Sequence, residues 1–570
     1  MSENYPAKGH PKGLYILFAT EMWERFNYYG MRAILVLFMT KALLFDHAFA
    51  SNLYGSYTSL VYLTPLLGGY IADRFWGNHR SIIWGGIVMA IGEFILFFCG
   101  SVYQSAPQLS TFLFFSGLGF MIAGNGFFKP NISSMVGQLY PKGDRRIDSA
   151  YTIFYMGINV GGALGPFICG LVGETGNPAD FRWAFLAAGI GMSLSVVVQK
   201  IFHHKYVVDS DNAVLGLVPK DSPKIFNNKI FSIIGLLLFS VIAIGLLYVD
   251  ARVVGYLTYL LAAAVVFIAF MIFSDKTLSV IEKQRIAVIF IVSFFVVFFW
   301  SAFEQAGASL TFFAADETQR MVGWNFPLWI IVALSLLLLF YLFKLYKKVQ
   351  KNLSGTFHKE LRVTVYFLLF LLFAGIAIGN IYLIGNSGKP ILLREFPASW
   401  FQSLNSIFVV SFAPLFAWLW LKLGKREPSS PTKMAFGLLL LSMGYMWIAF
   451  GVKGVQPGIK VSMIWLTGMY ALHTCGELCL SPIGLSLVNK LAPFKFASLL
   501  MAVWFLANAA ANKLAGVLSA LYPENGKTTS VLGYHMSNLY EFFMLFVFTA
   551  GLASLILFLL TKRLQKMMHQ

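Results

Sequence analysis

Four ionisable side chains lie in one short stretch near the N-terminus, EMWERFNYYGMR (Glu21 to Arg32), between the apolar runs GLYILFAT and AILVLFMT. On a helix, the four charges and two tyrosines share one arc of about 140°. These residues are Glu21, Glu24, Arg25, Tyr28, Tyr29 and Arg32. A charge facing lipid is costly, so we expect this face to line a protein interior or a water-filled cavity. The alternative is an ion-pair cluster that only holds helices together.

Further polar side chains interrupt the apolar segments along the rest of the chain. Lys129 precedes Pro130, which would leave a backbone carbonyl free to face a cavity. Glu304 and Glu477 are acids within other apolar runs. One cation and two anions from different helices are too costly to bury unpaired, so we expect partners to converge on them. Aromatic and amide residues at helical spacing are weaker candidates, since a Tyr or Trp more often packs than binds: Tyr62, Tyr155, Asn159, Trp300, Trp504 and Asn508.

The composition explains why charges within these runs are informative. Hydrophobic residues make up 58% of the 570 positions and charged residues 12%, with a mean hydropathy of +0.70. A soluble domain carries about 25% charged residues. Runs of roughly 20 apolar residues recur, each long enough to cross a bilayer core of ~30 Å as a helix. The sequence therefore predicts an all-α, polytopic membrane protein.

The net charge of +18 is carried largely by short loops on alternate sides of the apolar runs, such as YPKGDRR and KLGKR. This distribution follows the positive-inside rule and places both termini in the cytoplasm. It argues against nucleic-acid binding. The four cysteines fall in apolar segments and predict no disulfide. No nucleophile–base pair, metal cluster or Gly-rich phosphate loop indicates an enzyme.

About sixteen membrane-spanning segments are predicted. They form an N-terminal six-helix bundle at 14–203, a cytoplasmic linker with an inserted helix pair at 204–284, and a C-terminal six-helix bundle at 285–562. An extra hairpin at 326–384 interrupts the second bundle. It is either a structural brace or a contact for a partner, and the absence of charge at membrane depth favours the brace.

Five motifs together resemble those of the proton-dependent oligopeptide transporter (POT or PTR) family of the major facilitator superfamily. They are EMWERFNYYG, LTPLLGGYIADRFWGNHR, FYMGINVG, WSAFEQAG and GELCLSPIGLSLVNKLAP, in order between residues 14 and 561. The resemblance implies two six-helix halves with alternating access to a central site, here with two additional helix pairs. It implies proton-coupled symport of di- and tripeptides, driven by the proton gradient without a cofactor.

The resemblance also implies roles for individual residues. Glu21, Glu24, Arg25 and Lys129 would form a proton-linked salt-bridge network, and Glu304 would act in protonation and gating. Arg32 and Lys129 would hold the substrate carboxylate, and Glu477 its amino terminus. Other matches to pocket positions are Tyr28, Tyr29, Tyr62, Asn159, Trp300, Asn405, Trp504 and Asn508, and we count Tyr155 with them. Gly55 stands where animal members carry a histidine, so a histidine-based proton step is not expected.

Two alternatives stay open: a proton-coupled transporter of another small solute, such as nitrate or an organic anion, and a drug/proton antiporter. An acid facing Arg32 favours peptides, because a zwitterionic peptide has two charged ends a fixed span apart. The expected location is a bacterial inner membrane. A monomer would suffice for transport, and the oligomeric state stays open.

Overall fold

The computed structural model describes residues 9–326 and 391–569, apart from short gaps at 142–143, 145, 220–222, 224–228, 253–254, 457 and 525–526. It also includes residues 333, 336 and 340. The predicted hairpin at 326–384 therefore lies almost wholly outside the described residues. The chain divides into a first unit, Met1–Gln319 with Pro397–Gln570, and a second unit, Arg320–Phe396.

Long helices dominate the first unit. They are α1 (Lys12–Lys41), α2 (His47–Ile71), α3 (Asn78–Val102), α4 (Pro107–Gln138), α5 (Ile147–Gly173), α6 (Phe181–Tyr206), α8 (Lys229–Arg252), α9 (Tyr256–Phe273), α10 (Val280–Phe303), α14 (Trp400–Leu423), α15 (Ser430–Val452), α16 (Met463–Leu491), α17 (Ala497–Ser519) and α18 (Leu539–Met568).

Short helical turns lie between them: η1 (Ala72–Trp76), η2 (Pro178–Asp180), η3 (Glu304–Gly307), α11 (Ser309–Phe312), η4 (Phe313–Glu317), η5 (Gly424–Arg426) and η6 (Phe494–Phe496). Two short ribbons complete the unit. β1 (Thr318–Gln319) pairs in parallel with β4 (Val461–Ser462), and β5 (Thr529–Val531) pairs antiparallel with β6 (Tyr534–Met536).

The described part of the second unit is a single antiparallel ribbon of β2 (Met321–Phe326) and β3 (Ile391–Glu395). Its register pairs Met321 with Glu395, with an irregularity before Trp324. Arg320 forms an ion pair with Glu395 at 2.8 Å, which ties the two strands together at this end.

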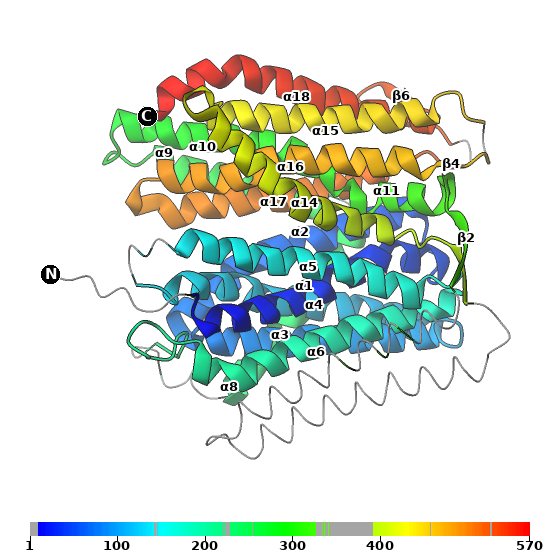
Figure 1. Cartoon of the computed structure of the whole chain (residues 1–570), viewed down its shortest axis with the longest axis horizontal. Coiled ribbons are helices and arrows are strands. Elements are labelled where there is room, and N and C mark those ends of the chain that lie inside the picture. The colour runs from blue at the N-terminus through cyan, green and yellow to red at the C-terminus, as the bar shows by residue number, and fades with distance from the viewer. Residues whose placement is uncertain are drawn as a thin grey trace. The chain divides into compact units, whose positions relative to one another are not determined.

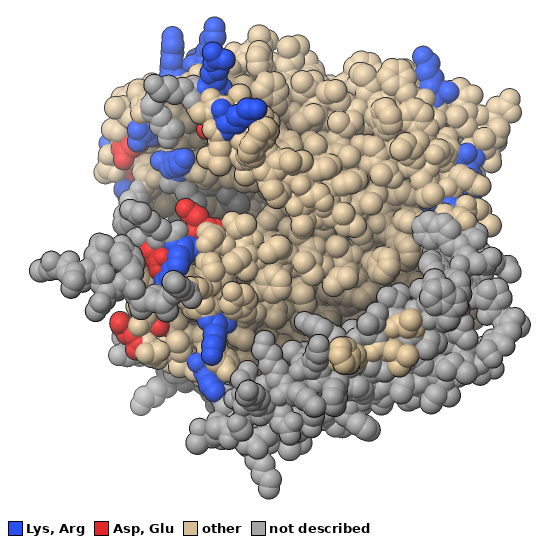
Figure 2. All heavy atoms as spheres, in the orientation of Figure 1, with Lys and Arg blue, Asp and Glu red and all other residues tan. Residues whose placement is uncertain are grey.

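Among the described residues, twelve helices are long and apolar enough to cross a membrane. Helices α1 and α2 have similar length but carry more polar residues. The all-α prediction is confirmed, whereas the count of sixteen spans is not. Figure 2 shows why the apolar helices suit a bilayer: Lys and Arg gather at two opposite ends of the visible face, and the wide band between them is uncharged.

Within the first unit, α1 to α6 contact one another, as do α10 and α14 to α18 (Figure 1). Contacts of α2 with α17 and of α5 with α14 join these two sets of helices, which we call the first and the second half. The start of α1 and the end of α18 lie at the same end of the helices, on the left in Figure 1. The chain thus returns to the end at which α1 begins, in keeping with an even number of spans.

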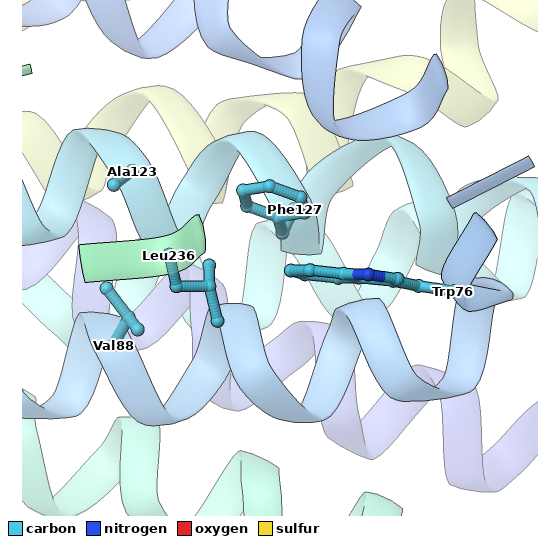
Figure 3. Packing of buried hydrophobic residues seen from close by; sticks show 5 residues of the cluster. All are labelled: Trp76, Val88, Ala123, Phe127 and Leu236. Carbon is cyan, nitrogen blue, oxygen red and sulfur yellow. The ribbon is translucent and has the colours of Figure 1, made fainter. Parts of the chain in front are cut away.

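The inserted pair, α8 and α9, contacts both halves: α8 packs on α4 and α2, and α9 packs on α17. The α8 contact is an apolar cluster, in which Leu236 meets Val88, Ala123, Trp76 and Phe127 (Figure 3). The rings of Trp76 and Phe127 stack with their centroids 5.0 Å apart.

Candidate functional site

The charged face of α1 is buried, as its spacing predicts. Arg25 Nε donates to Glu21 Oε1 at 2.7 Å and lies 3.1 Å from Glu24 Oε2. The other Glu24 oxygen accepts from Asn125 Nδ2 of α4 at 3.3 Å. One guanidinium thus faces two carboxylates, so a proton can join this cluster without leaving an unpaired cation.

Lys129 extends from α4 towards α2, where its Nζ lies 4.0 Å from the centroid of the Tyr62 ring. An ammonium group over a ring face is stabilised by the ring quadrupole, and by less than a full ion pair. In this conformation, the described residues form no ion pair with Lys129 within 4.0 Å. Its charge is therefore available to a carboxylate that enters from elsewhere.

A second ion pair joins the two halves. Arg32 of α1 pairs with Glu304, the first residue of η3, where α10 ends. Both side chains are buried. Tyr54 of α2 stands over the guanidinium, whose Cζ is 5.8 Å from its ring centroid. Charge, hydrogen bonding and an aromatic face therefore hold Arg32 in one place.

Glu477 of α16 differs from Glu304 because its hydrogen-bond partner, Asn405, is neutral. Its Oε2 accepts from Asn405 Nδ2 of α14 at 2.8 Å, and the same amide nitrogen lies 3.1 Å from Thr474 Oγ1. Glu477 belongs to none of the ion pairs among the described residues. A cationic group in the neighbouring space would therefore find a fixed, uncompensated acceptor.

Arg32, Glu304 and Glu477 line one cavity with about 680 Å³ of empty space, including its opening to solvent. It is lined from both halves by Tyr29, Arg32, Tyr62, Gly162, Pro166, Trp300, Phe303, Glu304, Ala306, Gln402, Asn405, Ser406, Tyr470, His473 and Glu477. The lining does not include Lys129 or the cluster of Glu21, Glu24 and Arg25. The mixture of aromatic walls and a few charged groups is typical of a small-molecule site. No group of three His, Cys, Asp or Glu side chains in the described part of the chain could hold a metal ion.

The remaining candidates lie outside the cavity lining. Tyr28 is buried, whereas Tyr155 is 40% exposed. Asn159 and Asn508 each donate to a backbone carbonyl of their own helix, four residues earlier. Trp504 packs so closely on Gly484 that a Cβ there would lie 2.1 Å from its ring.

Sequence reasoning missed five polar or aromatic lining residues, of which Phe303 directly precedes Glu304. Gln402 and Ser406 flank Asn405 at helical spacing on one face of α14, and His473 lies four residues before Glu477. Tyr470 lies a further turn away on α16. The same-face spacing around each predicted residue was the signal that could have found them.

The two halves touch closely at one end of the helices, which we call the closed end. It consists of residues 51–56 of α2 and 163–174 at the end of α5 in the first half, and of residues 398–403 at the start of α14 and 512–519 of α17 in the second half. A Cβ on Gly55 would lie 2.7 Å from Gly516 Cα, and Ser51 Oγ is 3.0 Å from Ser519 Oγ. Glu174 of the first half accepts from the backbone N–H groups of residues 398 and 399 at 2.8 and 2.9 Å. At Gly55 and Gly516 the two backbones touch directly, so no flexible side chain can adjust the separation of the helices at that point.

Comparison with known proteins agrees with this architecture. The family model for the POT family matches residues 79–212 and 391–534. Transporter YclF of Bacillus subtilis is 33% identical over 91% of this chain and 90% of its own length. Peptide transporter YePEPT of Yersinia enterocolitica is 31% identical over 90% of this chain and 88% of its own length.

A solved structure of a mutant of peptide transporter POT in complex with alafosfalin has a TM-score of 0.71 and 29% identity. The match covers 99% of this chain and 97% of that one. Two relatives and one solved structure are similar to this chain over nearly their whole length, and the POT family model matches it in two segments. The chain therefore belongs to the POT family.

Proposed function

We propose that this protein is a proton-coupled symporter that takes up di- and tripeptides by alternating access. The observation that carries the proposal is the cavity lined by Arg32 from the first half and by Glu477 from the second. A peptide presents a carboxylate and an ammonium group, and this cavity offers a cation and an acid. The similarity to the peptide transporter YePEPT and to solved peptide transporters supports the same substrate class.

Proton coupling rests on the α1 network and its neighbours. When Glu21 or Glu24 takes up a proton, the cluster around Arg25 loses one negative charge while Arg25 stays paired with the other carboxylate. The attraction of the cluster for the Lys129 ammonium group then falls, and Lys129 can bind the substrate carboxylate. We assign this role to Glu21, Glu24 and Arg25 with Lys129, and gating to the Arg32–Glu304 pair. One charge moving through 100 mV supplies about 2.3 kcal/mol, which corresponds to roughly fifty-fold accumulation of substrate.

The remaining residues that the sequence predicts for the site form the wider pocket of this proposal. Tyr28, Tyr155, Asn159, Trp504 and Asn508 would approach the substrate when the halves rearrange, whereas Tyr29, Tyr62, Trp300 and Asn405 already line the cavity. The core would be a major facilitator fold, with the inserted pair between its halves. By the positive-inside rule the closed end faces outwards and both termini are cytoplasmic in a bacterial inner membrane.

Uptake of radiolabelled dialanine into proteoliposomes tests the function, with and without an inward proton gradient. The proposal predicts accumulation that depends on the gradient. Accumulation of nitrate or an organic anion instead would favour the first alternative, and uptake stimulated by an outward gradient would favour the antiporter.

The variant Glu477→Gln tests the substrate orientation. Loss of a hydrogen bond to a charged group costs about 1.5–3 kcal/mol, so affinity for dialanine should fall by roughly 10- to 150-fold. N-acetylated dialanine should bind both forms equally. A matched control, Asp211→Asn, removes one carboxylate from an exposed loop and should leave both affinities unchanged. Equal losses for free and blocked peptides would remove Glu477 from amino-terminus recognition.

A further inference from the structure

A buried ion pair outside the cavity joins the inserted helix pair to the closed end. Asp250, near the end of α8, accepts from Lys513 Nζ of α17 at 2.5 Å. The carboxylate and the ammonium group are 2% and 1% exposed. Burying both charges is costly unless their geometry is well satisfied.

The surroundings satisfy both charges. Asp250 Oδ2 also forms a hydrogen bond with Ser56 of α2, and Lys513 Nζ lies 2.8 Å from the same hydroxyl. Asp250 Oδ1 accepts from the backbone N–H of Leu257 in the first turn of α9 at 2.8 Å. The three polar side chains come from the inserted pair, the first half and the second half.

Their position coincides with the tightest contact between the halves. Gly55 precedes Ser56, and Gly516 lies one turn after Lys513. The Gly55–Gly516 contact is between backbones, so any separation of α2 from α17 must also pull Lys513 away from Ser56. The charges of Asp250 and Lys513 keep all their hydrogen bonds only while the two halves touch. These bonds therefore stabilise the conformation in which the closed end is shut.

The same stretch of α17 also contacts the residue next to the ion pair at the cavity. Gln305 Nε2 donates to the carbonyl of Ala515 at 2.9 Å, and Gln305 directly follows Glu304. On the α2 side, Tyr54 lies against Gly307 and Arg32. Movement of either helix at the closed end therefore displaces a neighbour of the Arg32–Glu304 pair.

We propose that Asp250 holds α2 and α17 together at the closed end by bridging Ser56 and Lys513. The inserted helix pair is thus a clamp on one conformation of the transporter, and Asp250 and Lys513 are positioning residues for the ion pair at the cavity. The expected effect of the clamp on transport rests on the proposed function, whereas its effect on conformation does not. Its effect on conformation can be measured separately.

The test is a spin-label distance across the closed end in lipid nanodiscs. Labels at Ser105→Cys and Thr528→Cys occupy exposed loops of the two halves. Asp250→Asn should shift the open-to-closed ratio at least tenfold towards longer distances. Asp275→Asn is the matched control, because Asp275 forms an exposed ion pair with Lys495 beyond the opposite end of α9, and the distances should not change.

A double variant, Asp250→Asn with Lys513→Met, separates a clamp from simple charge balance. It leaves no unpaired charge, so it remains informative where a single variant fails to fold. The clamp predicts that the double variant still favours longer distances and changes the transport rate more than the apparent affinity. A distance distribution restored to that of the wild type would overturn the proposal. Failure of the wild type to transport dialanine would refute the proposed function and leave the distance result standing.

Discussion

Addition of a single methyl group at Gly55 should force the halves apart at the closed end. The Cβ of Gly55→Ala would lie 2.7 Å from Gly516 Cα and 3.0 Å from both the Gly516 nitrogen and the Asn512 carbonyl oxygen. These are backbone atoms of a helix, which cannot turn aside as a flexible side chain can. The added methyl therefore disfavours the contact between α2 and α17.

The magnitude follows from the cost of overpacking, about 1–3 kcal/mol for an extra carbon in a tightly packed contact. If the strain is relieved when the halves part, the open-to-closed ratio rises about 5- to 150-fold. Gly69→Ala is a matched control on the same helix, because its Cβ would meet Pro130 Cβ at an ordinary 3.5 Å. Both variants gain the same helix propensity from alanine, so their difference isolates the contact.

The assay is the distance between labels at Ser105→Cys and Thr528→Cys in each variant. We expect longer distances for Gly55→Ala and a wild-type distribution for Gly69→Ala. Identical distributions for the two alanine variants would refute the reasoning, because they would mean that backbone contact at Gly55 does not set the separation of the halves.

Two further predictions concern the proton network and the surface. Glu24→Gln or Lys129→Gln should abolish proton-driven uptake while some peptide exchange persists, since coupling needs both partners; equal loss of uptake and exchange in proteoliposomes would contradict this role. At the surface, hydrogen bonds from Lys495 and Thr277 lower the pKa of Asp275 below its ordinary 3.8. That contribution to stability is present above pH 3.8 and is lost as the pH falls towards the lower pKa of the folded protein. Asp275→Asn should therefore lower Tm at pH 7, with a gap to the wild type that narrows below pH 3.8; a gap independent of pH would contradict the assignment.

Much of the site followed from helix geometry alone. Charges on α1 that share one face had to be buried with partners, and the structure pairs Arg25 with Glu21 and Arg32 with Glu304. The first pair is local, at four residues' separation. For the second pair, the sequence predicted only that intramembrane acids and cations must find partners. It did not predict that Glu304, rather than another acid, pairs with Arg32.

Other contacts could not have been predicted from spacing. Asp250 and Lys513 lie on separate helices, and a single sequence does not say which helices become neighbours. Asp250 lies near the end of α8, where packing of α8 on α2 and of α9 on α17 buries it. Tyr155 shows that spacing within one helix can also be insufficient. It lies one turn before Asn159, but this spacing does not decide whether its side chain faces the cavity or the outside of the protein, and the side chain is 40% exposed.

The bond between Glu174 and the start of α14 gives the closed end an order of disassembly. The Glu174 carboxylate is only partly buried. When it moves away, water can therefore accept the hydrogen bonds of the two backbone N–H groups in its place. The Gly55–Gly516 contact and the Asp250 bridge are buried, so water cannot reach them until the helices have moved apart. Rupture should thus begin at the rim beside α14 and reach the interior between α2 and α17 last, so that solvent enters the transporter from one flank.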